Sequence, residues 1–178
     1  MSYKRKIWIT GSSGMLGKRL CSILKKSDNS ILEGNTKIFD QTIQKNVRDW
    51  LQINMPDEII VTSALVGGIN FNLSNSAEFL YKNSMIALNI IQAAHDLNIK
   101  NLVFLGSSCM YPKNANQPIE ESSLTHGEIE FTNESYGIAK ILGVKLIEKI
   151  NTQYNRKYLT IVPTAAFGPG DIYDEKKS

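Results

Sequence analysis

The chain has 178 residues, of which 42% are hydrophobic and 21% charged, a composition typical of a globular domain large enough to bury a substantial core. A formal net charge of +3 is too small to indicate a nucleic-acid partner, and two cysteines cannot form the disulfide framework of a small secreted domain. Because no secretory signal precedes the first expected strand and no apolar run is long enough to span a membrane, we expect a cytoplasmic protein.

Apolar runs and amphipathic stretches alternate along the whole chain. We expect strands at 6–10, 30–33, 38–39, 58–62, 101–106 and 159–163, and helices at 15–26, 43–53, 77–97 and 135–154. Residues 112–133 contain two prolines and many polar side chains, which predicts a surface loop. This alternation predicts a doubly wound α/β fold, in which helices cover both faces of a mostly parallel sheet, as in a Rossmann-type dinucleotide-binding domain.

A glycine-rich loop, G-S-S-G-M-L-G, follows the first expected strand and leads into the first helix. Its GxxGxxG spacing allows a tight turn, close approach of a pyrophosphate to the backbone, and close packing of helix on strand. The free N–H groups and the dipole of the helix N-terminus favour phosphate. We therefore predict a dinucleotide site made of Gly11, Ser12, Ser13, Gly14, Met15, Leu16 and Gly17.

Residues after the second expected strand bear on the choice between NAD and NADP. Glu33 lies 22 residues after Gly11 and could accept a hydrogen bond from the ribose 2′-hydroxyl, which favours NAD. Lys37 could instead reach a 2′-phosphate, which favours NADP. Alternatively, both residues are surface charges on a loop. We expect Asp40 to lie near the adenine.

A tyrosine and a lysine, Tyr136 and Lys140, lie four residues apart on an expected helix and therefore share a face. A phenol titrates near ~10, so a neighbouring ammonium would help it exchange a proton at neutral pH. Ser107 follows the strand 101–106 and could hold a carbonyl oxygen. A Tyr-x-x-x-Lys pair alone often arises by chance. Together with the glycine loop and the serine at a strand end, it predicts a carbonyl-reducing enzyme.

The combination resembles the extended short-chain dehydrogenase/reductase family. Within it, three segments look like the GDP-L-fucose synthases, which are GDP-4-keto-6-deoxy-D-mannose 3,5-epimerase/4-reductases. The segments are V-G-G-I at 66–69, F-L-G-S-S-C-M-Y-P-K at 104–113 and T-N-E-S-Y-G-I-A-K at 132–140. The resemblance extends from the first strand to Pro169.

This resemblance implies a role for each matching residue. Tyr136 would protonate the C4 oxygen while a nicotinamide delivers hydride, and Lys140 would hold the ribose hydroxyls and keep the pKa of the tyrosine low. Ser107 would orient the keto oxygen. Cys109 would exchange protons beside the ketone during epimerisation; the alternative is an ordinary thiol. The implied cofactor contacts at the later strand ends are Leu105, Gly106, Ser107, Ser108, Lys140, Pro163, Thr164, Ala165 and Ala166.

Two departures from the family pattern stand out. Relatives commonly carry Asn, an aliphatic residue and Tyr at Ala165, Ala166 and Phe167, so an amide and a phenol are missing. Relatives also continue into a C-terminal lobe that binds the GDP-sugar and supplies a histidine, and that lobe is absent from these 178 residues. We therefore expect residues 1–178 to be an NADP-binding domain (NAD remains possible), either a fragment or a truncated homologue, that binds dinucleotide weakly and turns over no GDP-sugar alone.

The expected partners are a GDP-4-keto sugar and a second copy of the chain. Helices 77–97 and 135–154 carry wide apolar arcs, which in relatives pair across a two-fold axis; the alternative is deep burial within one domain. Rival functions are reduction of a GDP-4-keto heptose and a non-catalytic dinucleotide-binding module. We expect no metal site, exposed positions for His95 and His126, and a core position for Cys21.

Overall fold

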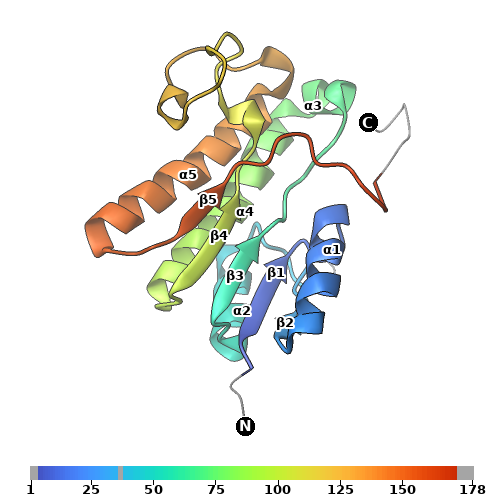
Figure 1. The fold of residues 1–178 in the computed structure, drawn as a ribbon, viewed down its shortest axis with the longest axis vertical. Helices are drawn as coiled ribbons and strands as arrows, with labels where there is room; N and C mark the ends of the chain where they lie inside the picture. The colour runs from blue at the N-terminus through green and yellow to red at the C-terminus, as the bar shows by residue number, and fades with distance from the viewer. Residues whose placement is uncertain (1–3, 36–37, 172–178) are drawn as a thin grey trace.

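A computed structural model describes residues 4–35 and 38–171 of the chain. Within these residues, five parallel strands form one sheet in the order β2-β1-β3-β4-β5 (Figure 1). The chain moves outward from β1 to β2 and then crosses back to β3, so the strand order reverses between β1 and β3, where ligands of such sheets bind. This topology confirms the doubly wound fold. The strands are β1 Lys6–Thr10, β2 Ser30–Leu32, β3 Glu58–Val61, β4 Asn101–Leu105 and β5 Leu159–Ile161.

The four long helices begin and end within two residues of the expected positions. They are α1 Met15–Leu24, α2 Gln44–Asn54, α4 Ser76–Asp96 and α5 Glu134–Tyr154. A short helix that the sequence did not predict, α3 Ile69–Ser74, precedes α4. Single 3-10 turns lie at Lys25–Ser27, Ser108–Met110, Glu121–Ser123 and Phe131–Asn133. Among the described helices, none is both long and apolar enough to cross a bilayer.

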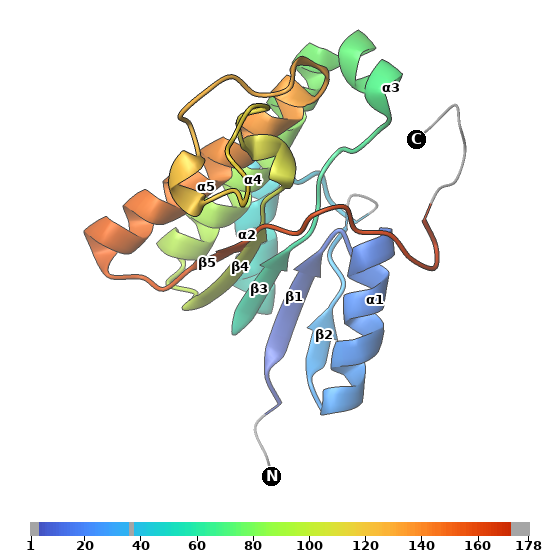
Figure 2. The same ribbon diagram turned by 45° about the horizontal axis from the view of Figure 1, so that its top comes forward.

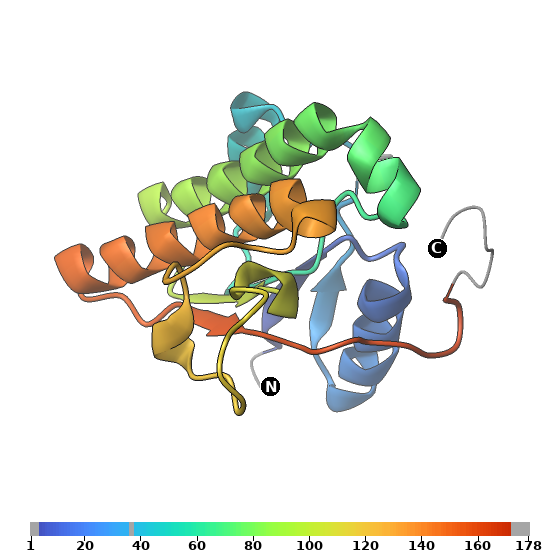
Figure 3. The same cartoon turned by 90° about the horizontal axis from the view of Figure 1, so that it is seen from above.

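The helices form two layers around the sheet. Helices α2, α4 and α5 cover one face and α1 lies on the other (Figure 3). The larger core lies under α2, α4 and α5, where Trp8, Ile59 and Phe104 are buried. On the other face, Ile7 and Ile9 pack with Cys21 of α1, so Cys21 is a core residue as expected.

The α1 face of the sheet is covered only in part. Leu159 pairs with Val103 and Ile161 pairs with Leu105, and these four apolar residues point to the same face as Ile7 and Ile9. Leu159 and Ile161 are more than half exposed. Within the described chain α1 is the helix on this face, so the expectation that helices cover both faces holds near β1 but not over β5.

The strand expected at residues 38–39 does not form. The backbone N–H groups of Ile38 and Phe39 both donate to the carbonyl of Asn35, at 2.9 and 3.2 Å, which makes a turn instead. The apolar character of Phe39 has another cause, because its ring packs 6.0 Å from the ring of Trp8 and 5.6 Å from that of Trp50.

Candidate functional site

The glycine turn has the geometry of a phosphate-binding loop. Gly11 adopts φ +63°, and a Cβ there would lie 2.9 Å from the backbone of Ser63. The N–H of Gly14 donates to the carbonyl of Gly11 at 2.9 Å and closes the turn. A Cβ on Gly17 would lie 2.2 Å from the Gly11 oxygen, so only glycine lets α1 approach this closely. Ser13 and Gly14 are exposed, and Met15 and Leu16 form the first turn of α1.

The hydroxyl of Ser12 supports the same interpretation. Ser12 is buried, and its Oγ has no hydrogen-bond partner within the described part of the chain. A buried polar atom without a partner is rare and requires an explanation. A phosphate oxygen at the turn would provide the missing partner, so these residues fit the pyrophosphate of a dinucleotide.

Two buried polar residues that sequence reasoning missed hold the neighbouring backbone. The Oγ1 of Thr10 accepts from the N–H groups of Thr62 and Ser63, both at 3.0 Å, which ties the end of β1 to the end of β3. Asn83 of α4 donates to the carbonyl of Leu65 at 3.0 Å and accepts from its N–H at 2.7 Å. The available signals were a threonine that ends a buried strand and an asparagine within an apolar helix.

The acidic residues after β2 lie on the surface. Glu33 forms an ion pair with Lys25, 2.5 Å between Oε1 and Nζ, and both side chains are about half exposed. Asp40 accepts from the hydroxyl of Thr42 at 2.7 Å and from its N–H at 2.8 Å, and these bonds hold the pKa of Asp40 below its usual value. Asp40 therefore caps the turn before α2. Lys37 lies outside the described residues.

Lys140 is the buried cation of the site. Its side chain lies under α5 with 4% exposure, and Nζ donates to the carbonyl of Leu105, the last residue of β4, at 2.7 Å. The same nitrogen lies 5.6 Å from the centroid of the Tyr136 ring and 4.8 Å from that of Phe104. Burial lowers the pKa of Lys140 to about 8, so the amine is mostly protonated at neutral pH.

The phenol of Tyr136 behaves differently from the sequence-based expectation. Burial, and then the electrostatic influence of nearby Cys109, raise the pKa of Tyr136 to about 12 rather than lowering it. The ammonium of Lys140 points to the Leu105 carbonyl and does not offset the burial. The phenol consequently carries its proton at neutral pH but is a weaker acid than a free tyrosine, so proton donation depends on stabilisation of the phenolate that it leaves.

Helix α5 packs directly on the turn that carries Ser107 and Cys109. A Cβ on Gly137 would lie 2.5 Å from the Cys109 carbonyl oxygen, so Gly137 allows this close contact. Ser107 is extended, and its Oγ accepts from the N–H of Cys109 at 3.2 Å, which orders the turn. Both residues are half-buried. The fold thus gathers Ser107, Cys109, Tyr136 and Lys140 at the carboxyl end of β4.

The segment after β5 begins beside this turn. The N–H of Gly106 donates to the carbonyl of Ile161 at 2.9 Å, and a Cβ on Gly106 would touch Val162. From there the chain runs toward α1 (Figure 2). Pro163 is half-buried, and Ser108, Thr164, Ala165, Ala166 and Phe167 are exposed.

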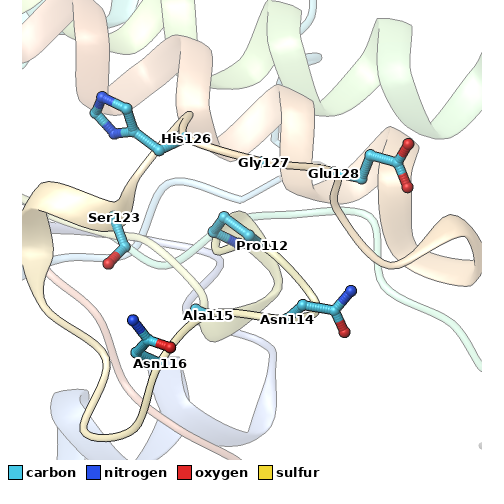
Figure 4. A pocket seen from close by; sticks show the side chains of 8 residues that line it. All are labelled: Pro112, Asn114, Ala115, Asn116, Ser123, His126, Gly127 and Glu128. Carbon is cyan, nitrogen blue, oxygen red and sulfur yellow. The ribbon is translucent and has the colours of Figure 1, made fainter.

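The two histidines occupy different surroundings. His95 is half-buried rather than exposed: its ring lies 4.3 Å from that of Tyr154, and within the described chain its buried Nδ1 has no partner. His126 is exposed as expected and lines an open cavity of about 350 Å³ in the 112–128 loop, together with Asn114, Asn116 and Ser123 (Figure 4). Neither histidine belongs to the site at the end of β4.

Comparisons with known proteins agree with this geometry. Residues 7–178 match the model of the NAD dependent epimerase/dehydratase family. The chain is 40% identical to a GDP-L-fucose synthase from Escherichia coli (strain K12) over 176 residues, 98% of this chain and 55% of that protein. Two solved Campylobacter jejuni structures each reach a TM-score of 0.93. A GDP-6-OMe-4-keto-L-xylo-heptose reductase is 34% identical, and the match covers 100% of this chain and 51% of that one. A GDP-D-glycero-L-gluco-heptose synthase in the presence of NADPH is 33% identical, and the match covers 99% of this chain and 52% of that one. The chain spans about half the length of each.

Proposed function

Because the chain belongs to the NAD dependent epimerase/dehydratase family, we propose that residues 1–178 are the cofactor-binding part of an NADP(H)-dependent reductase of a GDP-4-keto sugar. The first candidate substrate is GDP-4-keto-6-deoxy-D-mannose, which such an enzyme epimerises and reduces to GDP-L-fucose. The similarity to the E. coli GDP-L-fucose synthase supports this substrate, and the similarity to the C. jejuni heptose synthase, solved in the presence of NADPH, supports the cofactor.

One observation carries the proposal: a buried ammonium, Lys140, lies beneath the phenol of Tyr136 and is held by the strand that ends before Ser107. When bound, the reduced nicotinamide supplies the hydride. Tyr136 donates its proton to the substrate's carbonyl oxygen, Ser107 orients that oxygen, and Lys140 stabilises the charge that remains on the phenol. Cys109, beside them, moves protons at the carbons next to the ketone.

The test is binding of NADPH to the 178-residue chain, measured by calorimetry. Lys140→Met removes a charge-assisted hydrogen-bond donor worth roughly 1.5–3 kcal/mol, so affinity should fall about tenfold or more. Lys145→Met on the same helix is the matched control, because Lys145 is paired with Glu148 at 2.9 Å on the surface. Absence of dinucleotide binding, or equal affinity of the two variants, would contradict the proposal.

Cofactor preference has its own experiment. The carboxylate of Glu33 repels a 2′-phosphate and its partner Lys25 attracts one. Glu33→Gln should therefore raise the NADPH-to-NADH affinity ratio by about two- to fivefold, and Lys25→Met should lower it, the range expected for exposed charges. Unchanged ratios in both variants would place the 2′-phosphate elsewhere.

A second candidate substrate is a GDP-4-keto heptose, which the two C. jejuni structures favour. We also propose that the protein is cytoplasmic, since a reducing compartment suits its two free cysteines.

The proposed assembly is a homodimer in which α4 and α5 of one copy pack against α4 and α5 of the other.

A further inference from the structure

A small hollow adjoins Tyr136 on the side of α3. It lies between α3, the start of α4 and the start of α5, has a volume of about 130 Å³, and is lined by residues 72–73, 76 and 131–136. The 3-10 turn Phe131–Asn133, which leads into α5, packs against α3 and lines the hollow. Neither Ser107 nor Cys109 lines the hollow, so Tyr136 is the residue it shares with the site described above.

The lining is rich in neutral hydrogen-bonding groups. Among the lining residues, Ser76, Thr132 and Ser135 carry hydroxyls, Asn72 and Asn133 carry amides, and Glu134 carries the one carboxylate. Leu73 and Phe131 add apolar surface. Hydroxyls and amides beside an apolar wall suit a carbon chain that carries hydroxyl groups, and they do not suit a phosphate, which would require cations.

Asn72 has an unmet hydrogen bond. Its Nδ2 donates to Oδ1 of Asn133 at 3.0 Å, while its own Oδ1 is closed off from water and has no partner within the described chain. Leaving a buried acceptor unpaired is destabilising. If the amide turned toward the hollow, its oxygen could accept from a ligand hydroxyl.

The hollow is partly open to solvent, and its volume suits a short substituent. A hollow of this size corresponds to roughly four water molecules, at about 30 Å³ each. A whole sugar ring with its substituents is larger than this. A dihydroxyethyl side chain has four heavy atoms, a hydroxymethyl group two and a methyl group one, so the longest of the three fills the space best.

We propose that this hollow receives the exocyclic C5 substituent of the sugar and selects a hydroxylated substituent over a methyl group. The inference rests on the proposed function, because Tyr136 brings the sugar carbonyl beside the hollow. A methyl group would leave the Asn72 oxygen without a partner, and sites built for hydroxyls reject analogues that lack them. The hollow therefore favours the second candidate substrate, the GDP-4-keto heptose, over the 6-deoxyhexose proposed first.

The experiment measures binding of three methyl mannosides that differ only at C5, carrying methyl, hydroxymethyl or dihydroxyethyl. Each is titrated into the ¹⁵N-labelled 178-residue chain without nucleotide, and amide signals are followed. Signals of residues 72–76 and 131–136 should move, with affinity about fivefold higher for the dihydroxyethyl sugar than for the methyl sugar, the worth of one added hydrogen bond. Equal affinities, shifts confined to other residues, or no shifts at all would overturn the proposal.

Two variants sharpen the test. Asn72→Leu should abolish the preference. Ser76→Ala, a milder change at an exposed position, should reduce it and covers the case in which Asn72→Leu disturbs α3. Ser74→Ala on α3 is the control, because the Ser74 hydroxyl bonds to the Asn70 carbonyl at 2.8 Å and does not line the hollow. A preference that survives both hollow variants contradicts the proposal. Since no cofactor is present, failure here is distinct from failure of NADPH binding.

Discussion

At the scale of single residues, the site contains a buried amine and a half-buried phenol whose proton affinities shift in opposite directions. Burial lowers the pKa of Lys140 to about 8 and raises that of Tyr136 to about 12. Each shift disfavours the charged form. At neutral pH the phenol holds its proton and the amine is still mostly charged, so Tyr136 begins as the donor and Lys140 as the neighbouring cation.

The lysine shift predicts a pH dependence of stability. Between pH 8 and 10.5 the unfolded chain keeps a proton on Lys140 that the folded chain has released, so the free energy of unfolding rises with pH in that window. Relative to Lys140→Met, the natural chain should gain roughly 3 kcal/mol across it, at about 1.36 kcal/mol per pH unit. Urea denaturation at a series of pH values measures this difference.

Two further variants separate this effect from general alkaline unfolding. Lys145→Met removes an exposed amine and should keep the pH dependence of the natural chain. In the natural chain the phenol of Tyr136 ionises at a lower pH when the chain is unfolded than when it is folded, so the free energy of unfolding falls as the pH rises from 10 to about 12. Tyr136→Phe has no phenol to ionise and should not show this loss. A flat difference between the natural chain and Lys140→Met would mean that the amine is not desolvated.

At the scale of elements, the periodic spacing of apolar residues predicted the long helices and the central strands, because each of these elements buries a full face. It missed α3, whose six residues include the exposed Ile69, Phe71 and Leu73 and show no buried stripe. It wrongly assigned a strand to residues 38–39, because the apolar side chain of Phe39 belongs to an aromatic cluster with Trp8 and Trp50. The structure of a short segment depends on its tertiary neighbours, and the local sequence pattern carries no information about those neighbours.

The candidate site likewise has features that the local sequence predicted and features that it did not. The glycine turn and the Tyr-x-x-x-Lys pair were predictable because each is a local spacing with a known geometry. The raised pKa of Tyr136 was not, since it depends on burial and on Cys109, 27 residues earlier in the chain. The contributions of Thr10 and Asn83 depend on partners 52 and 18 residues away.

Contact between α5 and the Ser107 turn is the element-level feature most open to test. Gly137→Ala would place a methyl group 2.5 Å from the backbone oxygen of Cys109, and backbone yields less easily than a side chain. Overpacking of this kind costs about 1–3 kcal/mol, and it should move Tyr136 away from Ser107 and weaken NADPH binding. Gly168→Ala, which has nothing within 4 Å of its added methyl, is the matched control. Equal stability of the two variants in urea would refute the close contact.

At the scale of the whole molecule, handedness explains why one face of the sheet is richer in helices. The step from β1 to β2 runs in one direction across the sheet, whereas β2 to β3, β3 to β4 and β4 to β5 run in the other. Because each crossover between parallel strands is right-handed, a crossover in one direction across the sheet puts its helix on one face, and a crossover in the other direction puts its helix on the opposite face. Hence α1 stands alone on its face among the described helices, and the apolar residues of β5 on that face remain exposed.

The outer face of α4 and α5 yields the last prediction, that two copies associate there. Of the wide apolar arc noted in α5, Ile147 and Ile150 are buried within the monomer, so burial explains part of the arc, but Leu142 is 41% exposed and Tyr81 of α4 is 63% exposed. Sedimentation equilibrium should give twice the chain mass of 19.9 kDa. Leu142→Glu should return it to the monomer, because the association would bury an unpaired charge. Ile53→Glu, at an 82% exposed apolar position on α2, should leave the dimer intact, and a monomeric natural chain would contradict the prediction.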